Sequence, residues 1–331
     1  MLVELDTFIK NLDPPLSEEF RRFLKGDAPW DADAAKRFLT EHAELVERIE
    51  KIAALETRSS ENMPASYEGF FGARAVITAS EILLLKARLA AETGDSDAFF
   101  RSVSAASNLG AHLQKIESPT LLCETVHLVI DLNIKRATLN ILLPALGKNA
   151  DLSRWKSTFA ATSHTPSNLA QAMRGEWNTD SEHLVFPGMI VDARNGNLPD
   201  ADAVAHAYSS LFNAWVTQLP TLSLAQIESF SPQVDISHLS DPGREWVEAL
   251  PGFEAWSKNY LGSAVHSSQL QAALDLLILE QTGTPLSAID AVFVTQDPAS
   301  GQPFVFDPIK RELHTPEASS RLKIDPLVLP W

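Results

Sequence analysis

Glu124 and His127 form the only Glu-x-x-His pattern in the sequence. Positions i and i+3 are neighbours on one helix face, so a carboxylate and an imidazole at this spacing can share a metal ion. Helical di-iron sites combine two such pairs with two further glutamates. Because the sequence has no second pair, we interpret Glu124 and His127 as part of a polar helix face. We therefore expect no tightly bound transition metal and no other cofactor.

Cys123 is the only cysteine in the chain, so an intramolecular disulfide is excluded. It lies four residues before His127, a spacing that allows both side chains to face the same way. A thiolate nucleophile needs an accessible and electropositive setting, whereas Cys123 follows Leu121 and Leu122 in an apolar stretch. We expect a buried, inert thiol. The sequence lacks the common catalytic and phosphate-binding motifs: His-x-x-x-His, the Gly-x-Ser-x-Gly elbow, the P-loop and Gly-x-Gly-x-x-Gly. No catalytic residue is therefore assigned.

Tryptophan is the other residue type that could bind a ligand, since the chain has seven and five of them follow residue 170. Tryptophan can stack on sugars or anchor a peptide, but it more often packs in a core, which is the interpretation we favour. Two carboxylates about 5–10 Å apart beside such a ring would suit a glycoside hydrolase. The candidate ligand or partner surface comprises Trp177, Glu176, Asp180, Glu182 and His183.

The composition excludes some classes of partner. The chain of 331 residues has 27 basic and 43 acidic residues and a net charge of −16. Nucleic acids and anionic membrane surfaces both require a basic footprint, so neither is an expected partner. A hydrophobic content of 45% is sufficient for a substantial core.

Helices must position these residues, because apolar residues keep a period of 3.6 from 31 to 143 and again from 199 to 219. We expect long helices over 31–55, 67–93, 97–116, 120–143 and 199–219. Residues 178–200 are expected to be irregular, because Pro187-Gly188 and Asn195-Gly196-Asn197 are turn signals. This region divides an N-terminal helical region, 1–177, from a C-terminal one, 178–331, and the two could share one core. The predicted fold class is all-α, mainly an antiparallel helical bundle of hairpins, with a small C-terminal β-hairpin confined to about 290–314.

The C-terminal tail has the clearest local pattern. A helix with an apolar stripe over 270–278 ends at Gly283, and strands are predicted at 291–295, 303–307 and 311–314. We expect the turn from Asp297 to Phe304 to be a structural clasp: Asp297 accepts hydrogen bonds from the turn, and Gly301 has a positive φ. Phe304 and Phe306 should face the preceding helix, and the residue between them should face away.

Residues 269–326 contain, in order, a helix, Gly-x-x-Pro, Asp-Pro-x-x-Gly-x-Pro-Phe and a short strand. This order resembles the C-terminal end of type II secretion pseudopilins. It also resembles the tail of uncharacterised bacterial envelope proteins, as do 12–17 and 169–176. In that second group, a helical body follows a single N-terminal membrane anchor. The resemblance implies a periplasmic or cell-envelope location, with membrane contact only through an anchor that precedes Met1 and has been removed. Pseudopilins differ by a long apolar N-terminal helix and by calcium ligands near this loop, where this chain has only Asp297 and Asp307, so neither filament assembly nor calcium binding is carried over.

The leading functional hypothesis is a non-enzymatic helical envelope protein that acts as a scaffold or binds another protein. A hydrolase or carbohydrate-active protein with a site near Trp177 is one alternative, and a carrier of a small apolar ligand is another. A cytoplasmic location is also compatible with the single cysteine.

Overall fold

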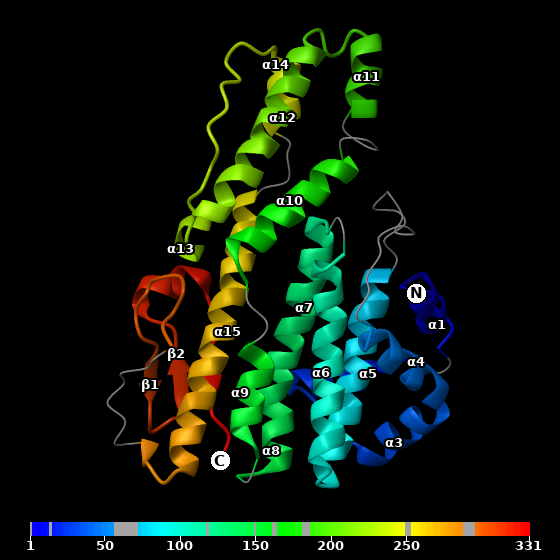
Figure 1. The fold of residues 1–331 in the computed structure, drawn as a ribbon, viewed down its shortest axis with the longest axis vertical. Helices are drawn as coiled ribbons and strands as arrows, with labels where there is room; N and C mark the ends of the chain where they lie inside the picture. Colours follow the sequence, from blue (N-terminus) through cyan, green and yellow to red (C-terminus); the bar gives the residue numbers. More distant parts are fainter. Residues whose placement is uncertain are drawn as a thin grey trace.

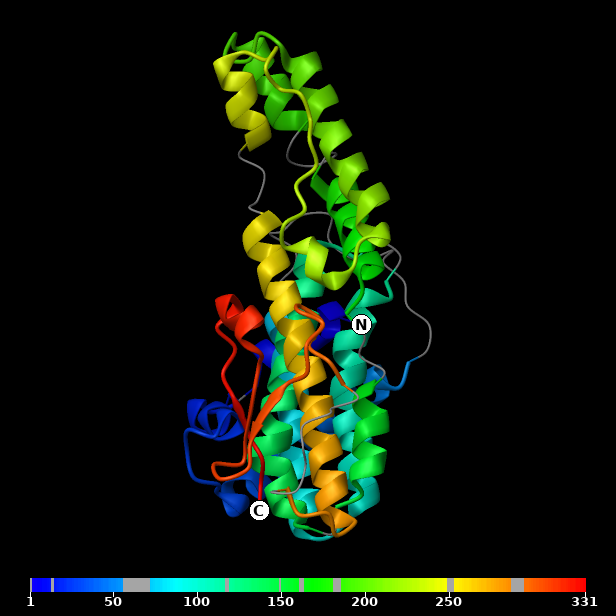
Figure 2. The ribbon, with the colours of Figure 1, turned by 90° about the vertical axis from the view of Figure 1, so that its left-hand side faces the viewer.

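The computed structural model shows a body of packed helices from which a narrower helical arm extends (Figures 1 and 2). The structure describes residues 2–12, 15–55, 72–116, 119–148, 150–160, 164–180, 186–248, 253–286 and 295–331. We call residues 166–260 the arm and the remainder the body. The predicted all-α fold with a small C-terminal β-structure is confirmed.

The elements follow the chain in this order: α1 (Leu2–Lys10), α2 (Glu18–Lys25), α3 (Ala32–Glu41), α4 (Ala43–Ala53), α5 (Gly72–Glu92), α6 (Ser96–Gln114), α7 (Leu121–Ala137), a π-helical turn (Thr138–Leu142), α8 (Leu143–Leu146), α9 (Leu152–Ala160), α10 (Pro166–Asp180), α11 (Phe186–Arg194), α12 (Ala201–Gln218), α13 (Leu224–Ile227), α14 (Asp241–Glu248), α15 (Phe253–Gln281), β1 (Val305–Asp307), β2 (Glu312–His314) and β3 (Leu327–Val328).

The centre of the body is the set of helices α5, α6 and α7, which pack against one another. α5 and α6 form a hairpin whose turn is fixed by Gly94, with φ of 71°, and by Asp95, whose side chain caps α6. Glycine tolerates positive φ without the steric cost that other residues incur. Most of α5 is buried, as expected for a helix surrounded by other elements. α5 and α6 thus correspond to the helices expected over 67–93 and 97–116.

Two of the predicted helices differ from the structure. The helix expected over 31–55 is interrupted at His42, where φ and ψ are −109° and 29°, so that α3 and α4 are separate. The His42 ring packs edge-on against Phe38, with centroids 4.7 Å apart. The helix expected to end at Pro144 continues to Leu146. A π-helical turn precedes Pro144, and in such a turn the hydrogen bonds shift by one residue, which accommodates a proline that has no N–H to donate.

The arm has a hydrophobic core of its own, in which α10, α12 and α14 contribute buried residues such as Met173, Phe212 and Val247. α11 lies in the region that we expected to be irregular, so that expectation was wrong for Phe186–Arg194, whereas the turn predicted at Asn195-Gly196-Asn197 is present, with Gly196 at φ of 78°. Pro187 occupies the first turn of α11, where no intrahelical N–H bond is required. Leu224 packs against both the arm core and the body core, so the two clusters meet.

α15 connects the arm to the body, running from one to the other in both views (Figures 1 and 2). Within the described residues the small sheet has the order β1-β2-β3 and is antiparallel, with Phe306 opposite Leu313 and Leu313 opposite Leu327. β1 and β2 match two predicted strands. β3 lies beyond the predicted limit of about 314, and most of the strand predicted at 291–295 falls outside the described residues.

The clasp predicted at the tail is present. The Asp297 carboxylate accepts hydrogen bonds from the Ala299 N–H at 3.0 Å and from the Ser300 hydroxyl at 2.6 Å. Gly301 has φ of 70°. Phe304 is buried in the body core and Phe306 is packed against it, whereas Val305 is exposed.

Among the described helices, none combines the length and the apolar character needed to cross a membrane.

Candidate functional site

Two side chains of the surface predicted around Trp177 lie within the described residues, and both are packed against other parts of the chain. Trp177 is half-buried in an aromatic group, with ring centroids 5.7 Å from Phe186, 5.8 Å from Tyr208 and 5.4 Å from Phe212. Its role in packing, which we favoured, agrees with this position. The side chain of the neighbouring Glu176 is buried.

Glu176 faces the body instead of solvent. Its Oε2 accepts a hydrogen bond from the backbone N–H of Leu121 at 2.9 Å, at the first residue of α7. Helix N-termini carry unsatisfied N–H groups and favour negative charge. The side chain of Asp180 and the whole of Glu182 and His183 lie outside the described residues, so only Trp177 and Glu176 of the predicted five-residue surface can be placed.

A different exposed feature lies at the far end of the arm, on α11 (Figure 1). Four exposed residues recur at i, i+3, i+4 and i+7 and form one helix face, which we call the distal stripe: Pro187, Ile190, Val191 and Arg194. Ile190 is 50% exposed and Val191 is 52% exposed. The opposite face of α11 is anchored, because Met189 is buried in the arm core.

Contacts with α14 hold α11 in place. The Trp246 indole N–H donates to the Asp192 carboxylate at 3.2 Å. Gly188 lies so close to the Trp246 ring that a Cβ at this position would approach the ring to 2.9 Å. The Pro187-Gly188 pair, which resembled a turn in the sequence, thus marks a helix start and a close approach between two helices.

A second candidate site is buried where the arm joins the body. We call it the buried polar cluster, and its members come from α7, from the residues just before α10 and from α15: Glu124, His127, Asp131, Lys135, His164, Ser263 and Ser267. The α7 members have the spacing i, i+3, i+7 and i+11, so they share one inward face of the helix. The polar face expected for Glu124 and His127 is therefore turned into the core and away from solvent.

Asp131 is the charged centre of this cluster. It pairs with Lys135, which also bonds to Ser267, and it lies 3.2 Å from Nε2 of His164. A carboxylate can only accept hydrogen bonds when ionised, so Nε2 of His164 must carry the proton. The hydroxyl oxygen of Ser263 lies 3.3 Å from the same nitrogen. Nδ1 of His164 then carries a lone pair, and this atom is buried without a hydrogen-bond partner among the described residues.

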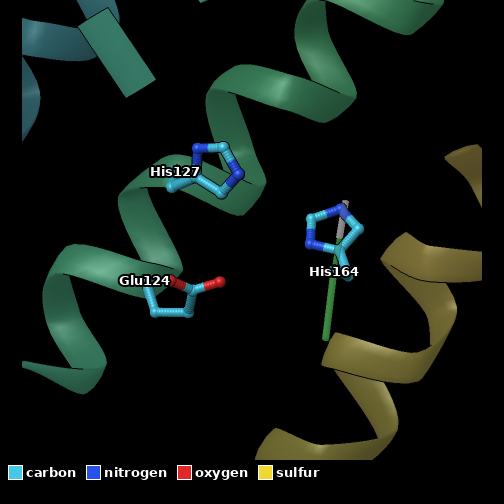
Figure 3. A group of neighbouring side chains, drawn as sticks. All are labelled: Glu124, His127 and His164. Carbon is cyan, nitrogen blue, oxygen red and sulfur yellow. The ribbon is translucent and has the colours of Figure 1, made fainter. Parts of the chain in front are cut away.

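Glu124, His127 and His164 point toward a common space (Figure 3). Each offers one ligand atom, and these three atoms lie within 4.8 Å of one another. His127 and His164 have ring centroids 5.8 Å apart. Gln114 Nε2 donates to both oxygens of Glu124, at 2.8 and 3.0 Å. Two imidazoles and one carboxylate are a ligand set for a divalent transition metal.

Burial sets the protonation of this site. Burial is the main cause that raises the pKa of Glu124 to about 7, and burial also lowers the pKa of His127 to about 4. The pKa of His164 is lowered for the same reason. Burial opposes ionisation of Asp131, but Lys135 and His164 outweigh it and hold the pKa of Asp131 below its usual range. The two histidines are therefore neutral at pH 7, the state in which imidazole binds metals.

Sequence reasoning found Glu124 and His127 but not His164, whose position next to α7 depends on the tertiary fold. The buried thiol predicted at Cys123 is confirmed, and burial raises its pKa further from the neutral range. No family model, curated protein or solved structure matches this chain. Its function is therefore inferred from the arm and the buried polar cluster themselves.

Proposed function

We propose that the protein is a non-enzymatic helical scaffold of the cell envelope, which binds another protein through the distal stripe of its arm. The observation that carries this proposal is the exposure of Ile190 and Val191 side by side on an anchored helix. Contiguous exposed apolar patches on a folded surface mark protein interaction sites.

Charge indicates the chemistry of the partner. Residues 186–248 contain eight aspartates and glutamates but only two arginines. A partner surface with apolar side chains flanked by lysine and arginine would complement this arm and be steered toward it. The same acidity disfavours nucleic acid and pairing of two arms with each other.

The stripe can be tested with matched substitutions of exposed apolar residues. Ile190→Glu and Val191→Glu should abolish retention of a partner from an extract of the organism that encodes the chain. Ile309→Glu alters a residue that is 94% exposed on the body and should leave retention intact. Retention would be followed by quantitative mass spectrometry, with a photo-crosslinking residue at position 190 to identify the bound segment. A retained set that is identical for all variants would contradict the proposal.

The envelope location is supported by the resemblance of the tail to envelope proteins. Fractionation of the native cells with an antibody against this chain should place the protein with the periplasm or membrane. Recovery solely in the cytoplasmic fraction would contradict this location without affecting the test of the stripe.

A further inference from the structure

We propose that Glu124, His127 and His164 bind one divalent transition metal ion inside the protein, at the junction of body and arm. The site is independent of the distal stripe and gives the chain a function beyond protein binding. It contradicts our own expectation from the sequence, which rested on the lack of a second Glu-x-x-His pattern. The third ligand comes instead from a lone histidine before α10.

His164 is prepared for a metal by its hydrogen bonds. The Nε2–H of His164 donates a hydrogen bond to the Asp131 carboxylate, 3.2 Å away. Nδ1, on the other side of the ring, is therefore unprotonated. This nitrogen is buried without a partner among the described residues. Metal-binding histidines commonly donate their other ring N–H to a carboxylate, which fixes the tautomer and strengthens the ligand. Asp131 is thus a positioning residue for His164.

Asp131 is itself held in place from a different direction. Lys135 pairs with it one helical turn along α7 and reaches Ser267 of α15. The three ligands and this second layer of groups therefore draw on α7, α15 and the segment before α10. Such outer groups restrict the rotation of the histidine ring, which a precise ligand geometry requires.

The other two ligands are oriented as well. Nδ1 of His127 lies against Gly110 of α6, where a Cβ would come within 3.1 Å of it, so Nε2 is the atom turned toward the cluster. Glu124 is held by Gln114, which donates to both carboxylate oxygens and leaves further lone pairs available.

The ligand types select the class of ion. Two imidazoles with one carboxylate suit Zn²⁺, Fe²⁺ or Co²⁺, whereas Mg²⁺ and Ca²⁺ prefer oxygen ligands. Ligand bonds of about 2.0–2.2 Å place the ligand atoms of a tetrahedral ion roughly 3.4 Å apart. The three atoms lie within 4.8 Å of one another, so side-chain movements of an ångström or so suffice to bring them to that spacing.

A purely structural polar network is the alternative explanation, and it accounts less well for His164. Buried polar atoms in folded proteins nearly always have a hydrogen-bond partner. A structural network would explain the bond to Asp131 but leaves Nδ1 of the same ring without one. A metal ion at this position satisfies Nδ1 together with the facing atoms of Glu124 and His127.

The test is titration of the full chain, first stripped with a chelator, with Co²⁺ and then with competing Zn²⁺. We expect one ion per chain, a visible Co²⁺ absorption band that Zn²⁺ removes, and no competition from Mg²⁺. Glu124→Gln and His164→Asn should each weaken Co²⁺ binding by about 100-fold or more, and Asp131→Asn by about 10- to 100-fold. His206→Asn changes an exposed histidine of the arm and should bind like the parent.

Two results would overturn the proposal: a parent chain that gives no Co²⁺ band, or ligand variants that bind as tightly as the parent. If a ligand variant does not fold, X-ray absorption of the zinc-loaded parent decides the matter. The spectrum should contain the scattering of two imidazoles. A spectrum without imidazole scattering would show that the ion sits elsewhere.

Discussion

The carboxylate of Glu176 in α10 accepts a hydrogen bond from the backbone N–H of Leu121, 2.9 Å away, and so caps α7 from the arm. Glu124 lies in the first turn of the same helix. The first helix of the arm is thereby tied to the helix that supplies most of the buried polar cluster. An acidic residue that we assigned to a partner surface is instead part of the joint.

Removing this cap should destabilise the fold. Glu176→Ala leaves a buried N–H without its charged acceptor and should reduce the free energy of unfolding by about 1.5–3 kcal/mol. Glu176→Gln retains an oxygen acceptor and should cost less. Urea denaturation measures both, with Glu245→Ala on the exposed face of α14 as the control. Equal urea midpoints for Glu176→Ala and the control would show that this hydrogen bond does not stabilise the fold.

Gly301 should tolerate alanine poorly because its φ is 70°. Gly301→Ala should lower the free energy of unfolding by about 1 kcal/mol or more. Gly301→Asn should cost less, since asparagine adopts positive φ more readily. Phe304 is buried behind this turn, and its substitution by alanine should reduce the free energy of unfolding by about 3–5 kcal/mol. Differential scanning calorimetry would compare the three variants; unchanged melting of all of them would mean that the clasp does not stabilise the fold.

Gly110 should be sensitive for a different reason, namely space. A Cβ there would meet Nδ1 of His127 at 3.1 Å and Cγ2 of Ile130 at 3.3 Å. Gly110→Ala should destabilise the chain by about 1–3 kcal/mol through overpacking, offset in part by better helix propensity. It should also displace the His127 ring and weaken Co²⁺ binding. Gly262→Ala in α15 has open space around it and should instead stabilise by about 0.5–1 kcal/mol. The opposite signs in thermal unfolding are the result to look for.

Stability should fall as the pH is lowered from about 6.5 to 4. Burial, followed by the charges of Lys135 and Arg136, lowers the pKa of His266 to about 4. Above pH 6.5 this histidine is neutral in both states. Below it, the unfolded chain takes up a proton that the folded chain rejects, which costs up to about 1.4 kcal/mol per pH unit. His127 acts with the same sign.

The carboxyl of Glu124 acts with the opposite sign, because its pKa of about 7 makes the folded chain bind a proton before the unfolded one does. His266→Gln should therefore reduce the slope of stability against pH, by up to the uptake of one proton. Urea denaturation of the metal-free chain at pH 4.5, 5.5 and 6.5 gives the slopes. A slope unaffected by His266→Gln would mean that this side chain titrates normally in the folded state.

Local signals in the sequence were reliable where a single residue determines the backbone. Gly301 has the positive φ expected of it, and Asp297 makes the predicted turn contacts. Features that depend on distant contacts were missed. Nothing in the sequence indicated that Gly188, in the first turn of α11, lies against Trp246, far along the chain. His164 reaches Asp131 across 33 residues, a relationship that no local pattern contains.

α15 has a consequence for any partner of the arm. It is a helix of 29 residues, about 43 Å long, that belongs to the arm at its start and to the body at its end. α15 also contacts β2 and β3 of the small sheet. A partner bound at the distal stripe, as proposed above, would therefore be connected to the C-terminal sheet through this one helix.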